Sequence, residues 1–123
     1  MRRDMDLIRS MLLRLEDCDK IRNGPGVLKE LADHDTISAH LKMLEDAGFL
    51  EHENLQAHGG VQMSLGWRIT WAGHEFLDTV RDPEIWQKTK AGAEKLGSWT
   101  IKLLADVATG FVRAKAQEIG LPI

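Results

Sequence analysis

The sequence predicts a small, mainly helical protein with one β-hairpin, and two observations support this fold class. Apolar residues recur every three or four positions over most of the chain, which is the spacing of amphipathic helices. Between residues 61 and 71 the period falls to two, which is the spacing of a half-buried strand. At 123 residues and 43% hydrophobic, the chain can form a core without disulfides or a structural metal.

The first expected helix begins after Asp4, whose carboxylate can cap the N–H groups of the first turn. Its apolar stripe consists of Ile8, Met11, Leu12 and Leu15. Acidic residues are interleaved with the arginines of this segment, so a solvated face is favoured over a binding patch. These arginines are Arg2, Arg3, Arg9 and Arg14.

The segment from Arg22 to Gly26 is the strongest cluster of helix breakers in the chain and predicts a loop. Residues 27–32 fit either a short helix or a short strand, and we favour the helix. This choice matters because a helix there would complete a helix-turn-helix with the helix that follows.

A second long helix is expected from Asp35 to Ala47, with Asp35 or Thr36 as its N-cap. Gly48 follows at the position where a left-handed residue often ends a helix. The apolar residues of this helix recur at helical spacing and are Ile37, Leu41 and Leu44.

Residues 49–55 and 61–71 are expected to pair as a β-hairpin, because His58-Gly59-Gly60 between them favours a turn. A short hairpin directly after a helix that ends in glycine is the order of a winged helix-turn-helix. The alternating apolar residues of the second strand are Val61, Met63, Leu65, Trp67, Ile69 and Trp71.

Three helices are expected after the hairpin. Thr70 is the expected N-cap of the first, Asp82 and Pro83 open the second, and Ser98 begins the third. We therefore divide the chain into a winged-helix domain, residues 1–81, and a C-terminal helical extension, residues 82–123. The apolar sides of the last two helices contain Ile85, Trp86, Ala93 and Leu96, and Ile101, Leu104, Ala108, Phe111 and Val112.

Charge and cysteine content limit the classes of function and the compartment. The net charge of −3 weighs mildly against a dedicated nucleic-acid binder, because such binding depends on neutralising phosphates. The single cysteine, Cys18, excludes an intrachain disulfide and fits a reducing compartment. The chain has no apolar run near the roughly 18 to 20 residues of a membrane span, and its opening lacks a signal-peptide core. We therefore expect a cytoplasmic protein.

Two resemblances extend these predictions. The segment from Thr36 to Leu50 resembles the recognition helix and following turn of bacterial winged-helix regulators. Arg68-Ile69-Thr70-Trp71-Ala72-Gly73 is similar to the Leu-Thr-x-x-Gly that follows the wing in those proteins. The resemblance implies a recognition helix over residues 35–47 and a wing over residues 56–68.

The second resemblance covers nearly the whole chain and is to an uncharacterised bacterial and phage-associated family, a domain of unknown function. It is carried by three blocks in the same order, an Arg-Asp-Met-Asp-Leu-Ile-Arg opening at residues 3–9, a block at residues 68–78 and a block at residues 81–86. It implies the winged-helix fold and an association with mobile or regulatory genes, but no activity.

The leading functional hypothesis is a DNA-binding transcriptional regulator of phage or prophage type. The outward residues of the first turns of a recognition helix reach base edges and phosphates of double-stranded DNA, and a wing contributes backbone contacts. The residues expected to do so are Thr36, Ser38, Ala39, Lys42 and Met43 in the helix, and Gln62 and Arg68 in the wing.

The alternative hypothesis is a non-catalytic protein–protein interaction module on the same scaffold. Over residues 35–58 five acidic residues oppose only Lys42, so the net charge of this segment is −4. Protonation of His40, His52 and His58 would move it toward −1, which predicts stronger binding below a pH of about 6.5. By analogy with other winged-helix regulators, the C-terminal helices are candidates for a homodimer interface.

Catalysis and metal binding are not expected. The two His pairs, His34 with His40 and His52 with His58, are each six residues apart, a spacing that fits no compact zinc motif. A buried, hydrogen-bonded His40 is favoured instead. Nucleophile, phosphate-loop and metalloprotease motifs are absent from the sequence, and no cofactor is expected. The tryptophans Trp67, Trp71, Trp86 and Trp99 are interpreted mainly as packing residues.

Overall fold

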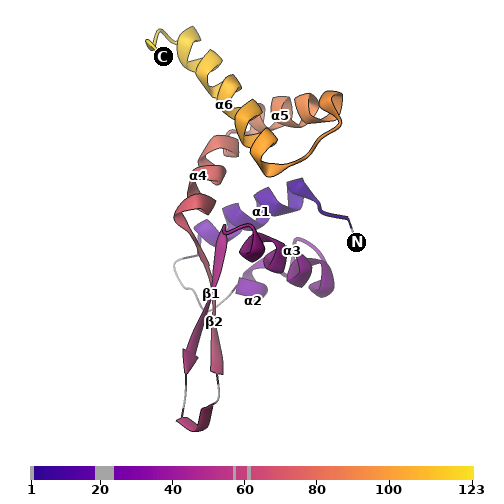
Figure 1. Cartoon of the computed structure of the whole chain (residues 1–123), viewed down its shortest axis with the longest axis vertical. Helices are drawn as coiled ribbons and strands as arrows, with labels where there is room; N and C mark the ends of the chain where they lie inside the picture. Colours follow the sequence, from indigo (N-terminus) through magenta and orange to yellow (C-terminus); the bar gives the residue numbers. More distant parts are fainter. Residues whose placement is uncertain (1, 19–23, 57, 61) are drawn as a thin grey trace. The chain divides into compact units, whose positions relative to one another are not determined.

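The structure, a computed structural model, describes residues 2–18, 24–56, 58–60 and 62–123, without the side chains of residues 24, 25, 55 and 62–65. It divides into two units, Met1–Glu75 and Phe76–Ile123. The described part is mainly helical with one two-stranded antiparallel sheet, which confirms the coarse prediction (Figure 1). The predicted domain boundary at residues 81 and 82 stays a prediction.

In the first unit, helices precede a hairpin. They are α1 (Met5–Glu16), α2 (Gly24–Leu28) and α3 (His34–Asp46), and the hairpin consists of β1 (Leu50–Gln56) and β2 (Gln62–Ile69). A 3₁₀ turn at His58–Gly60 lies between the strands, and α4 (Trp71–Val80) begins after β2. Helix α2 contacts α1, α3 and β2.

Helix α1 forms as its local sequence predicts. The Asp4 carboxylate caps it by accepting a hydrogen bond from the Leu7 N–H at 3.1 Å. The predicted stripe from Ile8 to Leu15 is buried. Both the cap and the helical spacing of apolar residues are therefore confirmed for this helix.

The predicted loop over residues 22–26 is wrong where it is described, because α2 begins at Gly24. Residues 22 and 23 lie outside the described residues. The favoured helix over 27–32 is correct only to Leu28, after which the chain turns. Leu28 is fully buried, and burial of a leucine contributes roughly 1.5–3 kcal/mol. That gain is comparable with the roughly 2 kcal/mol that two glycines cost a helix relative to alanine.

Helix α3 begins earlier than predicted, and its N-cap is neither Asp35 nor Thr36. The Asp33 carboxylate accepts a hydrogen bond from the Thr36 N–H at 2.8 Å, and the Thr36 side chain, followed by this N–H, lowers the pKa of Asp33. The predicted stripe of Ile37, Leu41 and Leu44 is buried. Gly48 has a φ of +82°, as expected for a residue that ends a helix.

The hairpin contains an irregularity that the sequence pattern does not show. Its register pairs Leu50 with Ile69 at the base, but Glu53 pairs with Gly66 and Asn54 with Ser64. A β-bulge therefore lies in β2 beside Gly66, whose φ of +116° suits glycine. Of the predicted alternation, Val61 lies outside the described residues, and the side chains of Met63 and Leu65 are not described.

The second unit contains the end of α4, α5 (Pro83–Leu96) and α6 (Ile101–Glu118). Asp82 caps α5 as predicted, and Gly97 ends it at a φ of +69°. Helix α6 begins later than predicted, because Thr100 and not Ser98 is its N-cap. The apolar side predicted for α5 is wrong at Leu96, which is 63% exposed. None of the described helices is long and apolar enough to cross a membrane.

Candidate nucleic-acid interface

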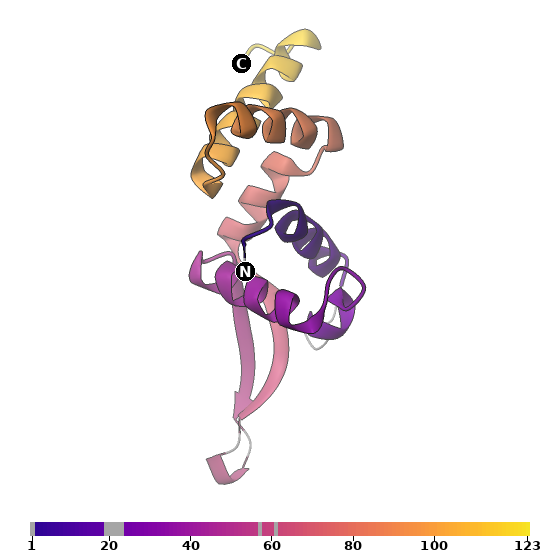
Figure 2. The same ribbon diagram turned by 90° about the vertical axis from the view of Figure 1, so that its right-hand side faces the viewer.

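The predicted recognition residues on α3 differ in exposure. Ser38 and Lys42 are exposed, whereas Thr36, Ala39 and Met43 are half-buried at the edges of the helix. Figure 2 shows α3 with the hairpin extending away from it. The outward face of α3 is therefore accessible over the first three turns, with the polar side chains at its centre.

Lys42 is paired within its own helix. Its Nζ lies 3.1 Å from Glu45 Oε1 and 3.7 Å from Asp46 Oδ1. The hydrogen bond to Glu45, followed by the charges of both carboxylates, raises the pKa of Lys42. The positive charge of Lys42 is consequently balanced by these two carboxylates, although its side chain is mostly solvent-exposed.

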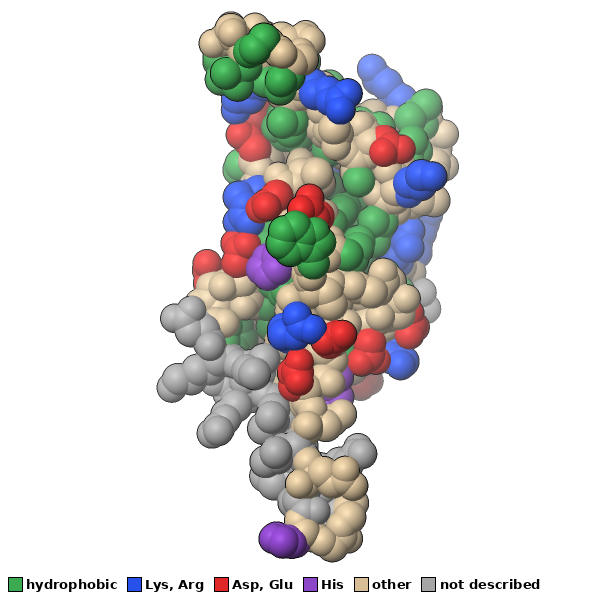
Figure 3. Space-filling model, turned by 60° about the vertical axis from the view of Figure 1, so that its left-hand side comes forward, with side chains coloured by type: hydrophobic (Ala, Val, Ile, Leu, Met, Phe, Trp, Pro, Cys, Tyr) green, Lys and Arg blue, Asp and Glu red, His purple; other side chains and the backbone are tan. Residues whose placement is uncertain are grey.

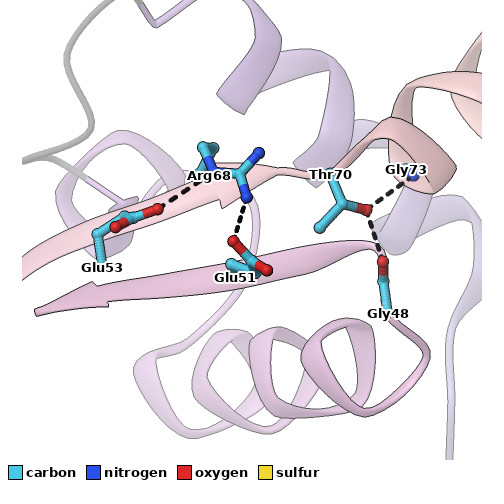
Figure 4. A network of polar contacts seen from close by, with 6 residues as sticks. All are labelled: Gly48, Glu51, Glu53, Arg68, Thr70 and Gly73. Atoms are coloured by element: carbon cyan, nitrogen blue, oxygen red, sulfur yellow. Dashed lines mark hydrogen bonds and ion pairs between the residues drawn. The ribbon is translucent and has the colours of Figure 1, made fainter.

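Arg68 is paired across the hairpin. The register places Glu51 opposite it, and its guanidinium donates hydrogen bonds to Glu51 and, at 3.1 Å, to Glu53 Oε1 (Figure 4). These carboxylates, Glu51 first, raise the pKa of Arg68 further above its ordinary value. Figure 3 shows Lys or Arg side chains beside Asp and Glu side chains at the base of the hairpin.

The structure agrees with the predicted acidic character of residues 35–58. Lys42 and Arg68, the two cations of the predicted site, each contact two carboxylates. The pairing of β1 with β2 brings Glu51 and Glu53 to Arg68. The sequence alone does not establish this contact, because Arg68 is 17 and 15 residues from the two glutamates. Gln62 lies in β2 opposite Gln56, but its side chain is outside the described part of the structure.

Thr70 fixes the base of the hairpin to the helices on both sides. Its hydroxyl donates to the Gly48 carbonyl at 2.5 Å and accepts from the Gly73 N–H at 3.1 Å, while its own N–H donates to the Phe49 carbonyl at 3.0 Å (Figure 4). The predicted N-cap role of Thr70 is thereby confirmed. A Cβ on Gly73 would overlap the Phe49 carbonyl oxygen and lie 2.8 Å from Ile69 Cγ2. The orientation of the hairpin is thus set by backbone contacts.

His40 is fully buried, as predicted, and both ring nitrogens are hydrogen-bonded. Nε2 lies 3.0 Å from the Asp4 N–H, and Nδ1 lies 2.8 Å from the Thr36 carbonyl oxygen. Because the Asp4 N–H is a donor and the Thr36 carbonyl an acceptor, Nε2 accepts one hydrogen bond and Nδ1 donates the other. His40 therefore links α3 to the residue that caps α1, and the predicted effect of protonating His40, His52 and His58 on binding stays a prediction.

Sequence reasoning missed the environment of Trp71. The alternating pattern predicts that this residue continues the strand and packs, but it is the first residue of α4 and is 80% exposed. Trp67 instead stacks on His52, with ring centroids 4.5 Å apart. The signal that distinguishes the two tryptophans is Thr70, whose hydroxyl starts a helix immediately before Trp71.

Comparison with known proteins identifies the family. Residues 2–99 match the family described as "Hypothetical protein (DUF2513)". The chain belongs to this family. An uncharacterized protein from Haemophilus influenzae is 39% identical to it over 93 residues, which cover 73% of this chain and 76% of that protein. No solved structure matches the chain. The predicted membership of an uncharacterised family is confirmed, and the DUF2513 match spans α3 and the hairpin.

Proposed function

We propose that this DUF2513 protein is a winged-helix transcriptional regulator of phage or prophage type, which binds double-stranded DNA through α3 and the hairpin. The observation that carries the proposal is the exposed face of α3 followed directly by Gly48 and an antiparallel hairpin. In winged-helix proteins a helix in this position enters the major groove, and the hairpin contacts the backbone beside it.

Helix α2 adds support to this proposal. A recognition helix needs a second helix that packs against it and crosses the DNA backbone. Although α2 has only 5 residues, it is helical and contacts α3. A strand in its place would have removed this support.

The proposed contacts assign different roles to the side chains. Ser38 and Lys42, at the centre of the exposed face, are placed toward base edges, with Thr36, Ala39 and Met43 at its border. Arg68 is assigned to the phosphate backbone, and Gln62 to the same hairpin contact.

The ion pairs of Lys42 and Arg68 do not prevent these contacts. Exposed ion pairs contribute little net stability, since solvent and salt screen them. Binding would exchange a carboxylate partner for a phosphate, with release of counterions from the DNA. The carboxylates that remain repel the phosphates, so the proposal implies modest affinity, and each cation that neutralises a phosphate makes the affinity fall further with salt.

Fluorescence anisotropy with fragments of the protein's own locus, between about 50 and 200 mM salt, tests the proposal. We expect fragment-selective binding that weakens steeply with salt and is lost in Lys42→Glu. Lys102→Glu, which makes the same charge change at an exposed position of α6, is the matched control and should bind normally. Absence of binding by the wild-type protein at the lowest salt would refute the proposal.

A second candidate function is favoured by Trp71. This side chain is 80% exposed, and Glu75 lies one helical turn later on the same face. A large exposed aromatic ring beside a carboxylate suits a partner protein that presents Lys or Arg, through cation–π and ionic contacts. On this alternative, the protein is an interaction module, and Trp71→Ala would abolish partner binding while leaving any DNA binding unchanged.

A further inference from the structure

We infer that the extended segment Arg2–Arg3 is a second phosphate-contacting element, held beside α3 by the hydrogen bond between Asp4 and His40. This inference rests on the proposed DNA-binding function and deepens it. The sequence alone favours a solvated face for these arginines, because acidic residues follow them closely. The tertiary contact changes that interpretation.

The segment is fixed to α3 by its own backbone. The Asp4 N–H donates to His40 Nε2 at 3.0 Å, although the two residues are 36 positions apart. The Asp4 carboxylate also caps α1, so this residue holds the start of α1 and α3 together. Figures 1 and 2 agree in showing the N-terminal segment beside α3.

The side of α3 that receives the segment borders the proposed recognition face. Thr36 lies four residues before His40 and Met43 three residues after it, so the three share one edge of the helix. Thr36 and Met43 are only half-buried, whereas His40 is fully buried beneath them. The Asp4 N–H therefore meets α3 at the edge that carries Thr36 and Met43, two of the predicted DNA contacts.

Arg2 and Arg3 also add positive charge near α3. Arg2 and Arg3 are both exposed and directly precede Asp4, whose N–H is bonded to α3, whereas carboxylates already surround Lys42 near the end of that helix. Guanidinium groups bind phosphate oxygens through two parallel hydrogen bonds. A phosphate strand that passes the Thr36 edge of α3 would thus meet these two cations beside the carboxylates of Asp33 and Asp35.

The test measures the salt dependence of binding to the fragment that the wild-type protein selects. Removing one cation that neutralises a phosphate makes the negative slope of log affinity against log salt less steep by about 0.9. We expect Arg2→Ala/Arg3→Ala to lower the slope by about 1 to 2 and to weaken binding at least several-fold at low salt. Lys102→Ala/Arg113→Ala, which removes two exposed cations of α6, is the control and should leave the slope unchanged.

The outcomes separate this inference from the proposed function. Salt-dependent binding by the wild type with an identical slope in Arg2→Ala/Arg3→Ala would overturn the role of the segment and leave the DNA-binding proposal standing. No binding by the wild type at about 50 mM salt would overturn both.

A second variant tests the anchor itself. His40→Leu removes the acceptor of the Asp4 N–H but keeps a buried side chain, and far-UV circular dichroism reports whether the helices remain. In a folded His40→Leu protein we expect weaker binding, because both arginines are present but no longer held beside α3. Wild-type affinity and slope in that folded variant would overturn the anchoring role, and if it does not fold, the arginine variant decides.

Discussion

Arg68 and Thr70 lie two residues apart at the end of β2, yet they take part in networks of opposite kinds (Figure 4). Thr70 bonds to backbone groups of Gly48, Phe49 and Gly73. Arg68 bonds to the side chains of two glutamates, and all three side chains are partly exposed to solvent. One network joins elements of the fold, whereas the other lies on the surface of a single hairpin.

The difference separates the part of the molecule that sets geometry from the part that can exchange partners. Backbone bonds at close-packed positions tolerate little change, because a new atom has no space. Exposed ion pairs form and break at little net cost. We therefore expect substitutions near Thr70 to change stability and substitutions near Arg68 to change binding.

The largest effect is expected for Gly73→Ala. The new Cβ would overlap the Phe49 carbonyl oxygen and press on Ile69, which should lower the free energy of unfolding by about 1–3 kcal/mol or more. Urea denaturation followed by circular dichroism measures this decrease. Gly110→Ala is the control, because its Cβ meets nothing within 4 Å and alanine favours the helix by up to about 1 kcal/mol. Equal stability of Gly73→Ala and wild type would show that this junction is not close-packed.

Thr70→Ala should have a smaller effect of the same kind. It removes the hydroxyl that caps α4 and bonds to Gly48, and loss of an N-cap costs about 1 kcal/mol. Thr70→Ser keeps the hydroxyl and should retain most of the stability. Denaturation of the two variants side by side distinguishes the hydrogen bonds from the methyl group, and a serine variant as unstable as the alanine variant would contradict this account.

Substitutions in the Arg68 network should change DNA binding and leave the stability nearly unchanged. Glu51→Gln/Glu53→Gln removes the two carboxylates that hold Arg68, and we expect several-fold tighter DNA binding with little change in stability. Glu94→Gln/Glu118→Gln in the second unit makes the same charge change at exposed positions and serves as control. If both double variants gain affinity equally, net charge and not the position of Arg68 is responsible.

Asp82 forms both a side-chain ion pair and hydrogen bonds to backbone N–H groups, and its substitution is expected to have the smallest effect on stability. Its carboxylate pairs with Lys115 and accepts the Glu84 and Ile85 N–H groups, and these contacts, Lys115 first, lower its pKa below 3.8. The resulting stability is present above the unfolded-state pKa of about 3.9 and is lost as the pH falls through the folded-state value.

Asp82→Asn keeps a capping oxygen but removes the charge. The variant should therefore be slightly less stable than wild type at neutral pH, and the difference should begin to shrink near a pH of about 4 and vanish as the pH falls through the folded-state pKa of Asp82. Thermal unfolding of both proteins across this range measures it. A difference that stays constant from neutral pH down to the lowest pH at which both proteins remain folded would assign the effect to the cap and not to the ion pair.

The sequence predicts what depends on neighbouring residues. The cap and stripe of α1, the capping of α5 by Asp82, and the end of α5 at Gly97 each follow from a few adjacent positions. Failures occur where distant contacts decide. Gly24 begins a helix because Leu28, buried in the core of its unit, stabilises α2 against its local preference.

The candidate site is less predictable than the fold for the same reason. The residues that hold Arg68 depend on the register of the hairpin, which a bulge beside Gly66 shifts. The contact between Asp4 and His40 joins segments that no local pattern relates. Trp71 satisfies both the alternating pattern of a strand and, after the predicted N-cap Thr70, the first position of a helix. The hydrogen bond between Thr70 and Gly73 confirms the helix, whereas no local pattern predicts that the Trp71 side chain is exposed.

The hydrogen bonds from Thr70 to Gly48 and Phe49 also indicate where the chain can accept inserted residues. They close the chain at the root of the hairpin, so residues beyond that point form a loop with fixed ends. Doubling the length of such a loop costs only about 0.6 kcal/mol in closure entropy. The turn at His58–Gly60 is accordingly a position for insertions, such as a peptide tag or a longer arm from a related protein, that leaves the spacing between α3 and the start of α4 unchanged.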